Sequence, residues 1–447
     1  MRINSALALV TGKSSQYILK NFFKRGSSYP GNLALKFDPH ILDTLAKDYE
    51  VIVVTGTNGK TLTTSLIVNI LKKQFDHVVT NKTGSNMIQG IVSTFLSAKK
   101  TNGKKFAVLE IDEASLAKIT TYIKPKMFVF TNIFRDQMDR YGEIYTTYDY
   151  ILKGAANAPE ALILANGDSP IFNSVETKNP RQYYGFDHED QGDILAHYNT
   201  EGILCPECQN ILHYKMITYG NLGNYFCPNC GFHRPQLDYK LTDLTYMDNV
   251  SSKFVIDGEE YGIEVGGMYN IYNALAAAAV AEHYEVPAEK IRAGLGYDEK
   301  VFGRQEVIDI DGKKVTIVLV KNPVGTNQVL ELMKLAPYNF SMVALLNANY
   351  ADGIDTSWIW DANYEFICDM NIDKFITGGQ RHKEIARRLR VAGAPKEKMV
   401  ELDDNFDALL KEIKSAPSEH IYVLATYTAM LNLRKDLTTQ GYIKEGM

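Results

Sequence analysis

The stretch VVTGTNGKTLTT, at residues 53–64, limits most strongly what this chain can fold into. It follows the apolar run YEVIVV and precedes the helical pattern TLTTSLIVNILKKQF, so it predicts a strand, a glycine turn and a helix. Such a turn offers backbone N–H groups and a helix N-terminus to a phosphate, while the lysine adds charge and the next hydroxyl can bind Mg²⁺. Val54 replaces the first glycine of the usual Walker pattern, and a turn that binds nothing is the alternative. The candidate phosphate-binding residues are Gly56, Thr57, Asn58, Gly59, Lys60 and Thr61.

Apolar strands alternate with helical patterns along most of the chain, which predicts an α/β fold with parallel sheets. KFAVLEID, KPKMFVFTNI and ALILANGD follow the glycine turn, and a second series of strands begins after residue 305 with KKVTIVLVK and SMVALLNAN. We therefore predict two domains. A first domain, which holds the phosphate-binding turn, would cover residues 1–304, with an N-terminal helix in residues 1–45, and a smaller α/β domain would cover 305–447.

Composition restricts the function classes. The 447 residues carry 48 basic and 53 acidic side chains, a net charge of −5 that argues against a nucleic-acid partner. No apolar run approaches the roughly 20 residues that span a bilayer, and the start lacks a signal-peptide pattern, so we expect a cytoplasmic chain without a transmembrane segment. Leu7, Val10, Tyr17, Ile18 and Phe22 can line one face of the N-terminal helix. Docking of this helix on its own domain is favoured over a membrane-surface helix.

Four of the five cysteines form two tight pairs, CPEC at 205–208 and CPNC at 227–230. Two such C-x-x-C pairs can meet around one tetrahedral ion, and disulfides are disfavoured in a cytoplasmic chain. We predict a structural zinc ribbon inserted at about residues 202–234, with Cys205, Cys208, Cys227 and Cys230 as ligands. Cys368 stands alone in the apolar run FICDM, where a small buried residue is expected.

The form TGTNGKT resembles the phosphate loop of the Mur ligase family and of the related folylpolyglutamate synthases. VLEIDEASL resembles the strand-end segment of that family in which a glutamate, here Glu110, binds Mg²⁺ together with Thr61. GMYNIYNALAA resembles its adenine-contacting segment, and FGRQE its hinge segment, so the resemblance implies that Asn270, Asn273 and Arg304 bind ATP. TNIFRDQMDRYGE also matches, although Gln137 stands where a histidine is usual, and Tyr269 replaces another histidine.

The segment NANYADGIDTSWIWDANYEF, at 347–366, holds both tryptophans of the chain and follows a predicted strand, where sites in α/β domains usually lie. Together with LVKNPVG at 319–325, which replaces the usual start of the C-terminal domain, it resembles a glutamine-dependent branch of the Mur ligase family. That resemblance implies a glutaminase partner, GatD, which supplies a cysteine and a histidine. Asp355 matches the acidic third member of the triad, and Asp352 is the alternative. Trp358 and Trp360 would contact the partner or pack in the core.

The resemblance implies ATP-dependent amidation in peptidoglycan synthesis. The α-carboxylate of D-glutamate in the lipid II stem peptide would become an acyl phosphate, and ammonia from the partner would convert it to D-isoglutamine. The enzyme would then act at the inner face of the cell membrane. One alternative is a stand-alone ligase of the Mur or folylpolyglutamate type that joins an amino acid. Another is a non-catalytic nucleotide-binding partner protein.

Overall fold

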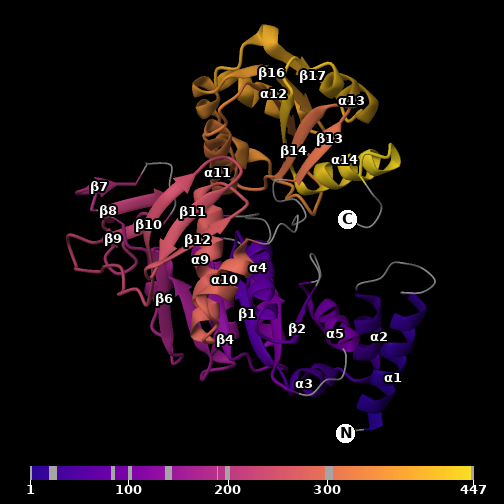
Figure 1. Ribbon diagram of the computed structural model, residues 1–447, viewed down its shortest axis with the longest axis vertical. Coiled ribbons are helices and arrows are strands. Elements are labelled where there is room, and N and C mark those ends of the chain that lie inside the picture. The colour runs from indigo at the N-terminus through magenta and orange to yellow at the C-terminus, as the bar shows by residue number, and fades with distance from the viewer. Residues whose placement is uncertain are drawn as a thin grey trace.

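A computed structural model describes the chain at residues 3–19, 28–81, 86–98, 103–135, 143–188, 190–196, 202–296 and 306–443. The larger part of the molecule is built on a nine-stranded sheet and the smaller part on a six-stranded sheet that lies above it (Figure 1). Among the described residues, no helix has both the length and the apolar character needed to cross a bilayer.

The nine-stranded sheet has the order β12-β11-β10-β6-β5-β4-β1-β3-β2. The seven strands from β10 to β2 in this order run parallel, and β11 and β12 add an antiparallel edge. The central strands are almost fully buried, which explains their continuous apolar runs. The strands are β1 (Glu50–Thr55), β2 (His77–Thr80), β3 (Lys105–Glu110), β4 (Met127–Phe130), β5 (Leu162–Asn166), β6 (Arg181–Phe186), β10 (Tyr239–Met247), β11 (Ser252–Ile256) and β12 (Glu259–Ile263).

Helices cover both faces of this sheet and enclose two apolar cores. One face carries α4 (Lys60–Lys72), α9 (Met268–His283) and α10 (Ala288–Leu295). The other face carries α1 (Ile3–Ile18), α2 (Tyr29–Phe37), α3 (Ile41–Ala46), α5 (Ile88–Ser97), α6 (Glu113–Ile119), α8 (Ile144–Ala156) and the 3-10 turn η2 (Pro170–Asn173).

The N-terminal region forms three helices, α1, α2 and α3, where the sequence pattern suggested one. Helix α1 docks on its own domain, as favoured, but not through the predicted apolar face. Its inward side consists of small residues such as Ser5, Ala8 and Gly12. A Cβ added to Gly12 would lie 2.7 Å from Leu96 of α5, so a small residue sets the close approach of these two helices.

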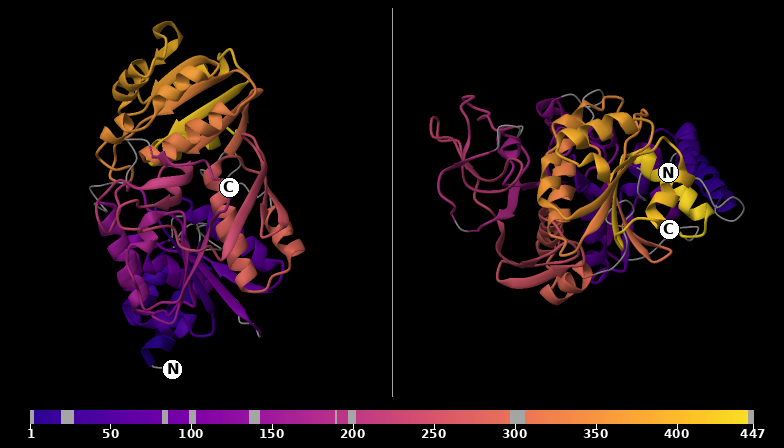
Figure 2. Two further views of the ribbon diagram at one scale, coloured as in Figure 1. Left: turned by 90° about the vertical axis from the view of Figure 1, so that its left-hand side faces the viewer. Right: turned by 90° about the horizontal axis from the view of Figure 1, so that it is seen from above.

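The cysteine-containing insertion folds as a separate three-stranded antiparallel sheet of β7 (Ile194–Leu195), β8 (His213–Tyr219) and β9 (Leu222–Phe226). It lies between β6 and β10 in the chain and projects from the side of the larger part, as the right-hand view of Figure 2 shows. A buried carboxylate joins it to the main sheet. Asp168 accepts hydrogen bonds from Arg234 (2.9 Å), from Tyr272 of α9 (2.7 Å) and from the backbone N–H of Phe186 (2.8 Å).

The six-stranded sheet has the order β13-β14-β18-β15-β16-β17, and all strands except the edge strand β13 run parallel. The segment that would join the two domains, around the predicted boundary at 304/305, lies outside the described residues. The strands are β13 (Glu306–Ile310), β14 (Lys313–Leu319), β15 (Phe340–Leu345), β16 (Ile372–Gly378), β17 (Met399–Glu401) and β18 (His420–Ala425). The helices are α11 (Pro323–Lys334), α12 (His382–Val391), α13 (Phe406–Lys414) and α14 (Tyr427–Thr439), with 3-10 turns η3 (Ser357–Trp360), η4 (Tyr364–Asp369) and η5 (Lys396–Lys398).

Candidate nucleotide site and metal centre

The predicted phosphate loop lies between β1, at the centre of the sheet, and the N-terminus of α4. Gly56 has a φ of 129° and Gly59 a φ of 85°, a backbone region that side chains rarely allow. A Cβ at Gly59 would also lie 2.1 Å from Oδ1 of Asn273. The two glycines therefore make a cradle that no other residue could form, and its N–H groups lie at a helix N-terminus.

The segment that follows β4 holds this loop in place. The side chain of Asn132 accepts a hydrogen bond from the backbone N–H of Asn58 (2.9 Å) and donates one to its carbonyl (3.0 Å). Thr57 pairs with Phe134 through its hydroxyl, and its N–H donates to the carbonyl of Asn132 (2.8 Å). The TNIF part of the matched segment thus fixes the loop before any ligand binds, which was not evident from the sequence.

Lys60 is largely buried and points back into the loop. Its Nζ donates to the carbonyl of Gly56 (2.5 Å) and lies 3.0 Å from Oε1 of Glu113, the first residue of α6. Burial acts to lower the Lys60 pKa, but the negative charges of Glu113, Glu110 and Asp112 outweigh it and raise the pKa. Lys60 is therefore cationic. Glu113 was not singled out from the sequence. Its position three residues after Glu110, at a helix start, was the only available signal.

Glu110 ends β3, the strand next to β1, and is buried. The side chain of Asn81, just after β2, accepts from its N–H (2.9 Å) and donates to its carbonyl (2.8 Å). This pairing fixes the backbone of Glu110 beside the loop. Thr61 lies in the first turn of α4. A hydroxyl and a carboxylate are suitable Mg²⁺ ligands, because this hard cation prefers oxygen.

Asn270 and Asn273 lie in the first turns of α9 and are buried. Oδ1 of Asn273 accepts from the Thr63 hydroxyl (3.1 Å), so this residue supports α4. Within the described part of the chain, Oδ1 of Asn270 and Nδ2 of Asn273 have no hydrogen-bond partner. Buried amide atoms without partners cost free energy, so they fit a site that a ligand completes. Arg304 and Gln137 lie outside the described residues.

A mostly apolar pocket lies beside the loop, where the two domains meet. Asn322 caps α11 by accepting from the N–H of Gly325 (2.7 Å) and donates from Nδ2 to Oδ1 of Asn58 (3.3 Å). The rebuilt LVKNPVG segment therefore contacts the phosphate loop directly. The pocket is lined by residues of both domains and of the cysteine insertion, including Asn58, Tyr219, Tyr269, Asn322, Val324 and Val329.

The two candidate triad aspartates have different surroundings. Asp352 is buried, and its two oxygens accept from the N–H (2.6 Å) and hydroxyl (2.5 Å) of Thr428 and from the N–H of Asn349 (3.0 Å). Asp355 is exposed, and within the described residues it accepts hydrogen bonds from the N–H (2.8 Å) and the hydroxyl (2.9 Å) of Ser357. These bonds, first the backbone one, and the positive charge of Arg135 lower the Asp355 pKa.

Both tryptophans lie near Asp355. Trp358 packs against the core of the C-terminal domain, while Trp360 is half exposed beside the guanidinium of Arg388. Tyr350 and Ile354 are also exposed in this segment. The same segment contacts the larger domain, because Asp361 forms an ion pair with Arg135 (3.1 Å).

The four predicted cysteine ligands converge. Their Sγ atoms all lie within 4.8 Å of one another, and Cys205–Cys230 and Cys208–Cys227 are each 3.5 Å apart. Four thiolates around a tetrahedral Zn²⁺ would lie about 3.8 Å apart, so the donor set fits such an ion and leaves no open position. The cluster can hold a metal ion. Cys368, by contrast, is exposed, so its expected burial was wrong. Its thiol donates to the carbonyl of Ala392 (3.0 Å).

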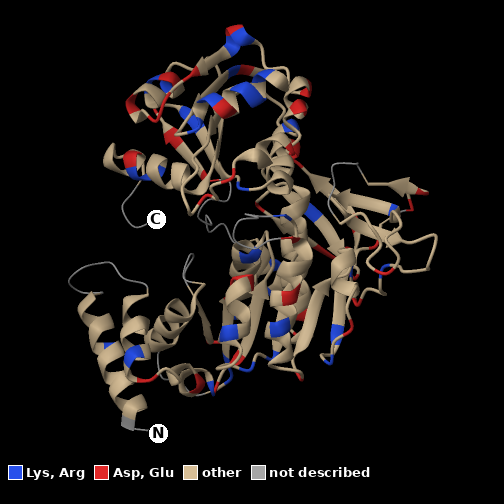
Figure 3. Ribbon diagram, turned by 180° about the vertical axis from the view of Figure 1, so that it is seen from behind, with Lys and Arg blue, Asp and Glu red and all other residues tan. Residues whose placement is uncertain are grey.

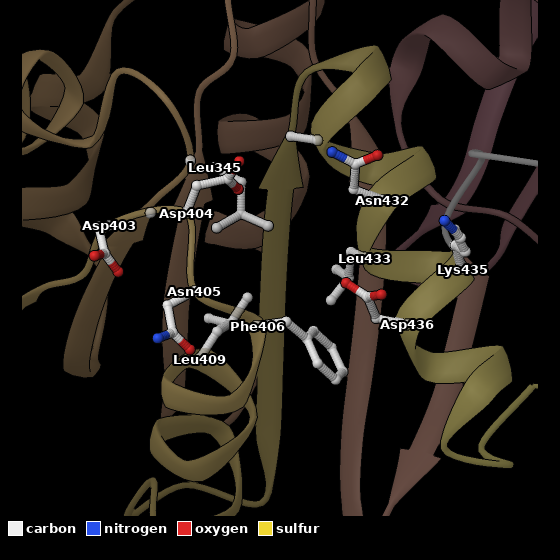
Figure 4. A pocket seen from close by; sticks show the side chains of 13 residues that line it. Leu345, Asp403, Asp404, Asn405, Phe406, Leu409, Asn432, Leu433, Lys435 and Asp436 are labelled. Carbon is white, nitrogen blue, oxygen red and sulfur yellow. The ribbon is translucent and has the colours of Figure 1, made fainter.

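A second pocket lies in the C-terminal domain between α13 and α14, near the ends of β15 and β16. Figure 4 shows Asn405 and Leu409 on one side and Asn432, Leu433 and Asp436 on the other. It is separate from the phosphate loop and from Asp355, and none of the predicted site residues lines it.

The parallel sheet, the fixed phosphate loop and the second α/β domain define a class, the nucleotide-binding ligases with Mur ligase architecture. The profile described as Mur ligase middle domain matches residues 54–230, and the one described as MurT ligase C-terminal matches 319–430. The chain also resembles a pseudomurein peptide ligase type C from Methanothermus fervidus, with a TM-score of 0.69 at 21% identity over 98% of this chain and 97% of that one.

Proteins of similar sequence show which family within this class the chain belongs to. The chain is 56% identical over 448 residues, the full length of both proteins, to the lipid II isoglutaminyl synthase (glutamine-hydrolyzing) subunit MurT of Streptococcus pneumoniae. It is 36% identical to the Staphylococcus aureus subunit of the same name over 85% of this chain and 86% of the relative. The chain belongs to the MurT family.

Proposed function

We propose that this chain is the synthetase subunit of a glutamine-hydrolysing lipid II isoglutaminyl synthase. It would use ATP to amidate the α-carboxylate of D-glutamate in the stem peptide. The observation that carries the proposal is the phosphate loop, which is pre-formed and joined to the C-terminal domain through Asn58 and Asn322. It occurs in a chain that matches a subunit of that name along its whole length.

The loop supports activation of a carboxylate. A carboxylate is a poor electrophile, and attack of its oxygen on the γ-phosphorus of ATP gives an acyl phosphate and ADP. The N–H groups around Gly56 and Gly59 would bind phosphate oxygens, and Lys60 would offset the charge that develops on the transferred group. For this, Lys60 must exchange the Gly56 carbonyl for a phosphate while Glu113 keeps its position. Thr61 and Glu110 would hold Mg²⁺, which neutralises phosphate charge when it is bound.

The base of ATP would lie in the pocket between the domains. The unpartnered amide atoms of Asn270 and Asn273 lie on the helix beside it, and Tyr269 lines it. Arg304 stays a predicted ligand of the γ-phosphate. Ammonia then attacks the acyl carbon, phosphate leaves, and the amide of D-isoglutamine remains.

The ammonia would come from a glutaminase partner, GatD, that docks on the C-terminal domain. Asp355 would complete the partner's cysteine–histidine pair, because a carboxylate hydrogen-bonded to the histidine fixes its tautomer and stabilises the imidazolium. Asp352 is less suited, since Thr428 and Asn349 already use its oxygens. Trp360, Tyr350 and Ile354 are exposed apolar side chains that a partner could cover.

The metal of the cysteine cluster would be zinc with a structural role, because four thiolates leave no position for substrate. The substrate is lipid-linked under this proposal, so the complex would work in the cytoplasm at the inner face of the cell membrane. A stand-alone amino-acid ligase stays the alternative, and it would use an amino acid in place of ammonium.

The test is glutamine hydrolysis by the co-purified two-subunit complex, wild type against Asp355→Asn. We expect hydrolysis to fall about 10⁴-fold, because the amide no longer holds the histidine in the correct tautomer. ATP-dependent amidation with added ammonium should persist. Asp404→Asn, another exposed aspartate of the same domain, is the matched control. Unchanged hydrolysis in an assembled Asp355→Asn complex would remove Asp355 from the triad. Product formed with a free amino acid in place of ammonium would favour the stand-alone ligase.

A further inference from the structure

The side of α1 that faces away from the protein is apolar. Leu7, Val10, Tyr17 and Ile18 are 49%, 64%, 69% and 49% exposed. At about 100° per residue, these four side chains fall within an arc of about 100° on the helix. They form the α1 outer face. It is the stripe that the sequence marks as a packing surface, but the domain packs against the opposite side through Ser5, Ala8 and Gly12.

The sequence segments that form α1, α2 and α5 carry one sign of charge. Residues 1–37 contain six basic and no acidic side chains, and residues 77–109, which include α5, contain five lysines and no acid. The rest of the chain has 37 basic and 53 acidic side chains, a net charge of −16. Figure 3 shows α1, α2 and α5 without red. The first acidic residue, Asp38, is buried and accepts from the Ser5 hydroxyl (2.6 Å).

These helices form one packed unit at the β2 edge of the nine-stranded sheet. Helix α2 packs between α1 and α5, and the N–H of Gly31 donates to the Ser93 hydroxyl of α5 (2.8 Å). Exposed lysines, Lys13 on α1 and Lys36 on α2, lie on the same unit as the exposed rings of Tyr29 and Phe37. The edge is two strands from β1, which leads into the phosphate loop.

We propose that the α1 outer face is a membrane-docking surface that lies on an anionic phospholipid bilayer. An amphipathic helix with apolar side chains on one face and lysines beside them binds in the interface, and anionic headgroups strengthen the binding. Helix α1 has 16 residues and is about 24 Å long, too short to span the roughly 30 Å apolar core, so it lies along the surface.

Charge also argues against a second copy of the chain as the occupant. Two copies meeting through this face would bring two acid-free, lysine-bearing units together, and like charges disfavour such contacts. An anionic bilayer offers both the apolar layer and the opposite charge. This inference rests on the proposed function only for the reason that the protein would bind a membrane: a lipid-linked substrate would place the site near one.

The experiment measures binding of the full-length chain, in complex with its partner, to vesicles of phosphatidylcholine and to vesicles of equal phosphatidylcholine and phosphatidylglycerol. The variant Leu7→Ser, Val10→Ser, Tyr17→Ser should bind the anionic vesicles at least about tenfold more weakly. The double variant Val250→Ser, Val391→Ser removes equally exposed apolar side chains elsewhere and should bind like wild type.

A second variant keeps the test decisive if the triple change lowers stability. Lys13→Glu with Lys36→Glu alters only exposed charges and should weaken binding to anionic vesicles by about tenfold or more, with no change on neutral ones. The surface proposal is overturned if wild type shows no preference for anionic vesicles, or if the triple variant binds as well as wild type. It is also overturned if light scattering shows a dimer that only the triple variant loses while neither protein binds vesicles.

Amidation with ammonium on a water-soluble stem-peptide substrate separates this inference from the proposed function. The triple variant should amidate this substrate like wild type. Vesicle binding as expected without any amidation by wild type would refute the function and leave the docking surface standing. Amidation without vesicle binding would refute the docking surface and leave the proposed function standing.

Discussion

The phosphate loop and the segment around Asp355 differ in how firmly contacts within the chain hold them in place. In the loop, Asn132, Thr57 and Glu113 hold the backbone and Lys60 in a fixed arrangement. Asp355 has only the turn of Ser357 to hold it and faces solvent. A site that must stabilise a transition state benefits from pre-organised groups, whereas half of a shared site must stay open until the partner arrives. The two regions should therefore respond to mutation in different ways.

Lys60→Met should have the largest effect. Removal of its charge is expected to lower ATP-dependent amidation by about a thousandfold, because the Lys60 ammonium lies inside the loop, where it donates to the Gly56 carbonyl. Glutamine hydrolysis by the complex should be nearly unchanged, since the proposed function assigns that reaction to Asp355 and the partner. The readouts are ammonium-driven amidation and glutamate release from glutamine. Lys72→Met, at the far end of the same helix, is the matched control. Equal loss of both activities would show that the two regions are not separable.

Asp352→Asn should mainly affect stability. The carboxylate accepts three hydrogen bonds, two of them from Thr428 at the start of α14, and an amide would place N–H donors against one of them. We expect a loss of about 2 kcal/mol in the free energy of unfolding, against less than about 0.5 kcal/mol for Asp355→Asn. Urea unfolding of the chain and hydrogen exchange at the Thr428 amide measure this difference. Normal stability with lost glutamine hydrolysis would instead identify Asp352 as the triad acid.

Metal removal tests whether ATP binding depends on the folded cysteine insertion. The insertion reaches the site, because Tyr219 lines the pocket between the domains and its ring centroid lies 5.9 Å from that of Phe134. Arg234 also pairs with the buried Asp168. Chelation, or Cys227→Ser, should unfold the insertion and weaken ATP binding by about tenfold. Titration calorimetry with ATP gives the affinity, and Cys368→Ser is the control. Unchanged affinity in a metal-free chain would show that the insertion only supports itself.

Much of the site could be predicted because local rules decide it. Gly56 and Gly59 are needed wherever a loop takes these φ values, and two C-x-x-C pairs can meet only in a few ways. Glu113, Asn81 and Asn132 could not be found in this way. Their roles depend on which strands are neighbours in the sheet, and the β2-β3-β1-β4 order is not written in any one segment.

The N-terminal helix shows the other limit of sequence reasoning. An apolar stripe usually marks the buried face of a helix, so docking through Leu7, Val10 and Tyr17 was the favoured interpretation. The structure buries Ser5, Ala8 and Gly12 instead, because α2 and α5 approach α1 closely and only small residues fit between them. The same stripe is the α1 outer face, which we propose as the membrane-docking surface.

Ser357→Ala should have the smallest effect. It measures how much the Ser357 turn fixes the Asp355 carboxylate before the partner binds. The Ser357 N–H lowers the Asp355 pKa most, its hydroxyl adds to this, and Arg135 contributes charge. The lowered pKa keeps the carboxylate charged at neutral pH, and this charge is lost only as the pH falls through the folded-state pKa. Loss of the hydroxyl should raise the Asp355 pKa and leave the side chain freer to rotate. Glutamine hydrolysis should fall about two- to fivefold at neutral pH, and the Asp355-dependent loss of activity should begin at a higher pH. Thr356→Ala, the preceding residue, is the control. A fall as large as that of Asp355→Asn would mean that the Ser357 turn fixes this half-site as firmly as Asn132 fixes the phosphate loop.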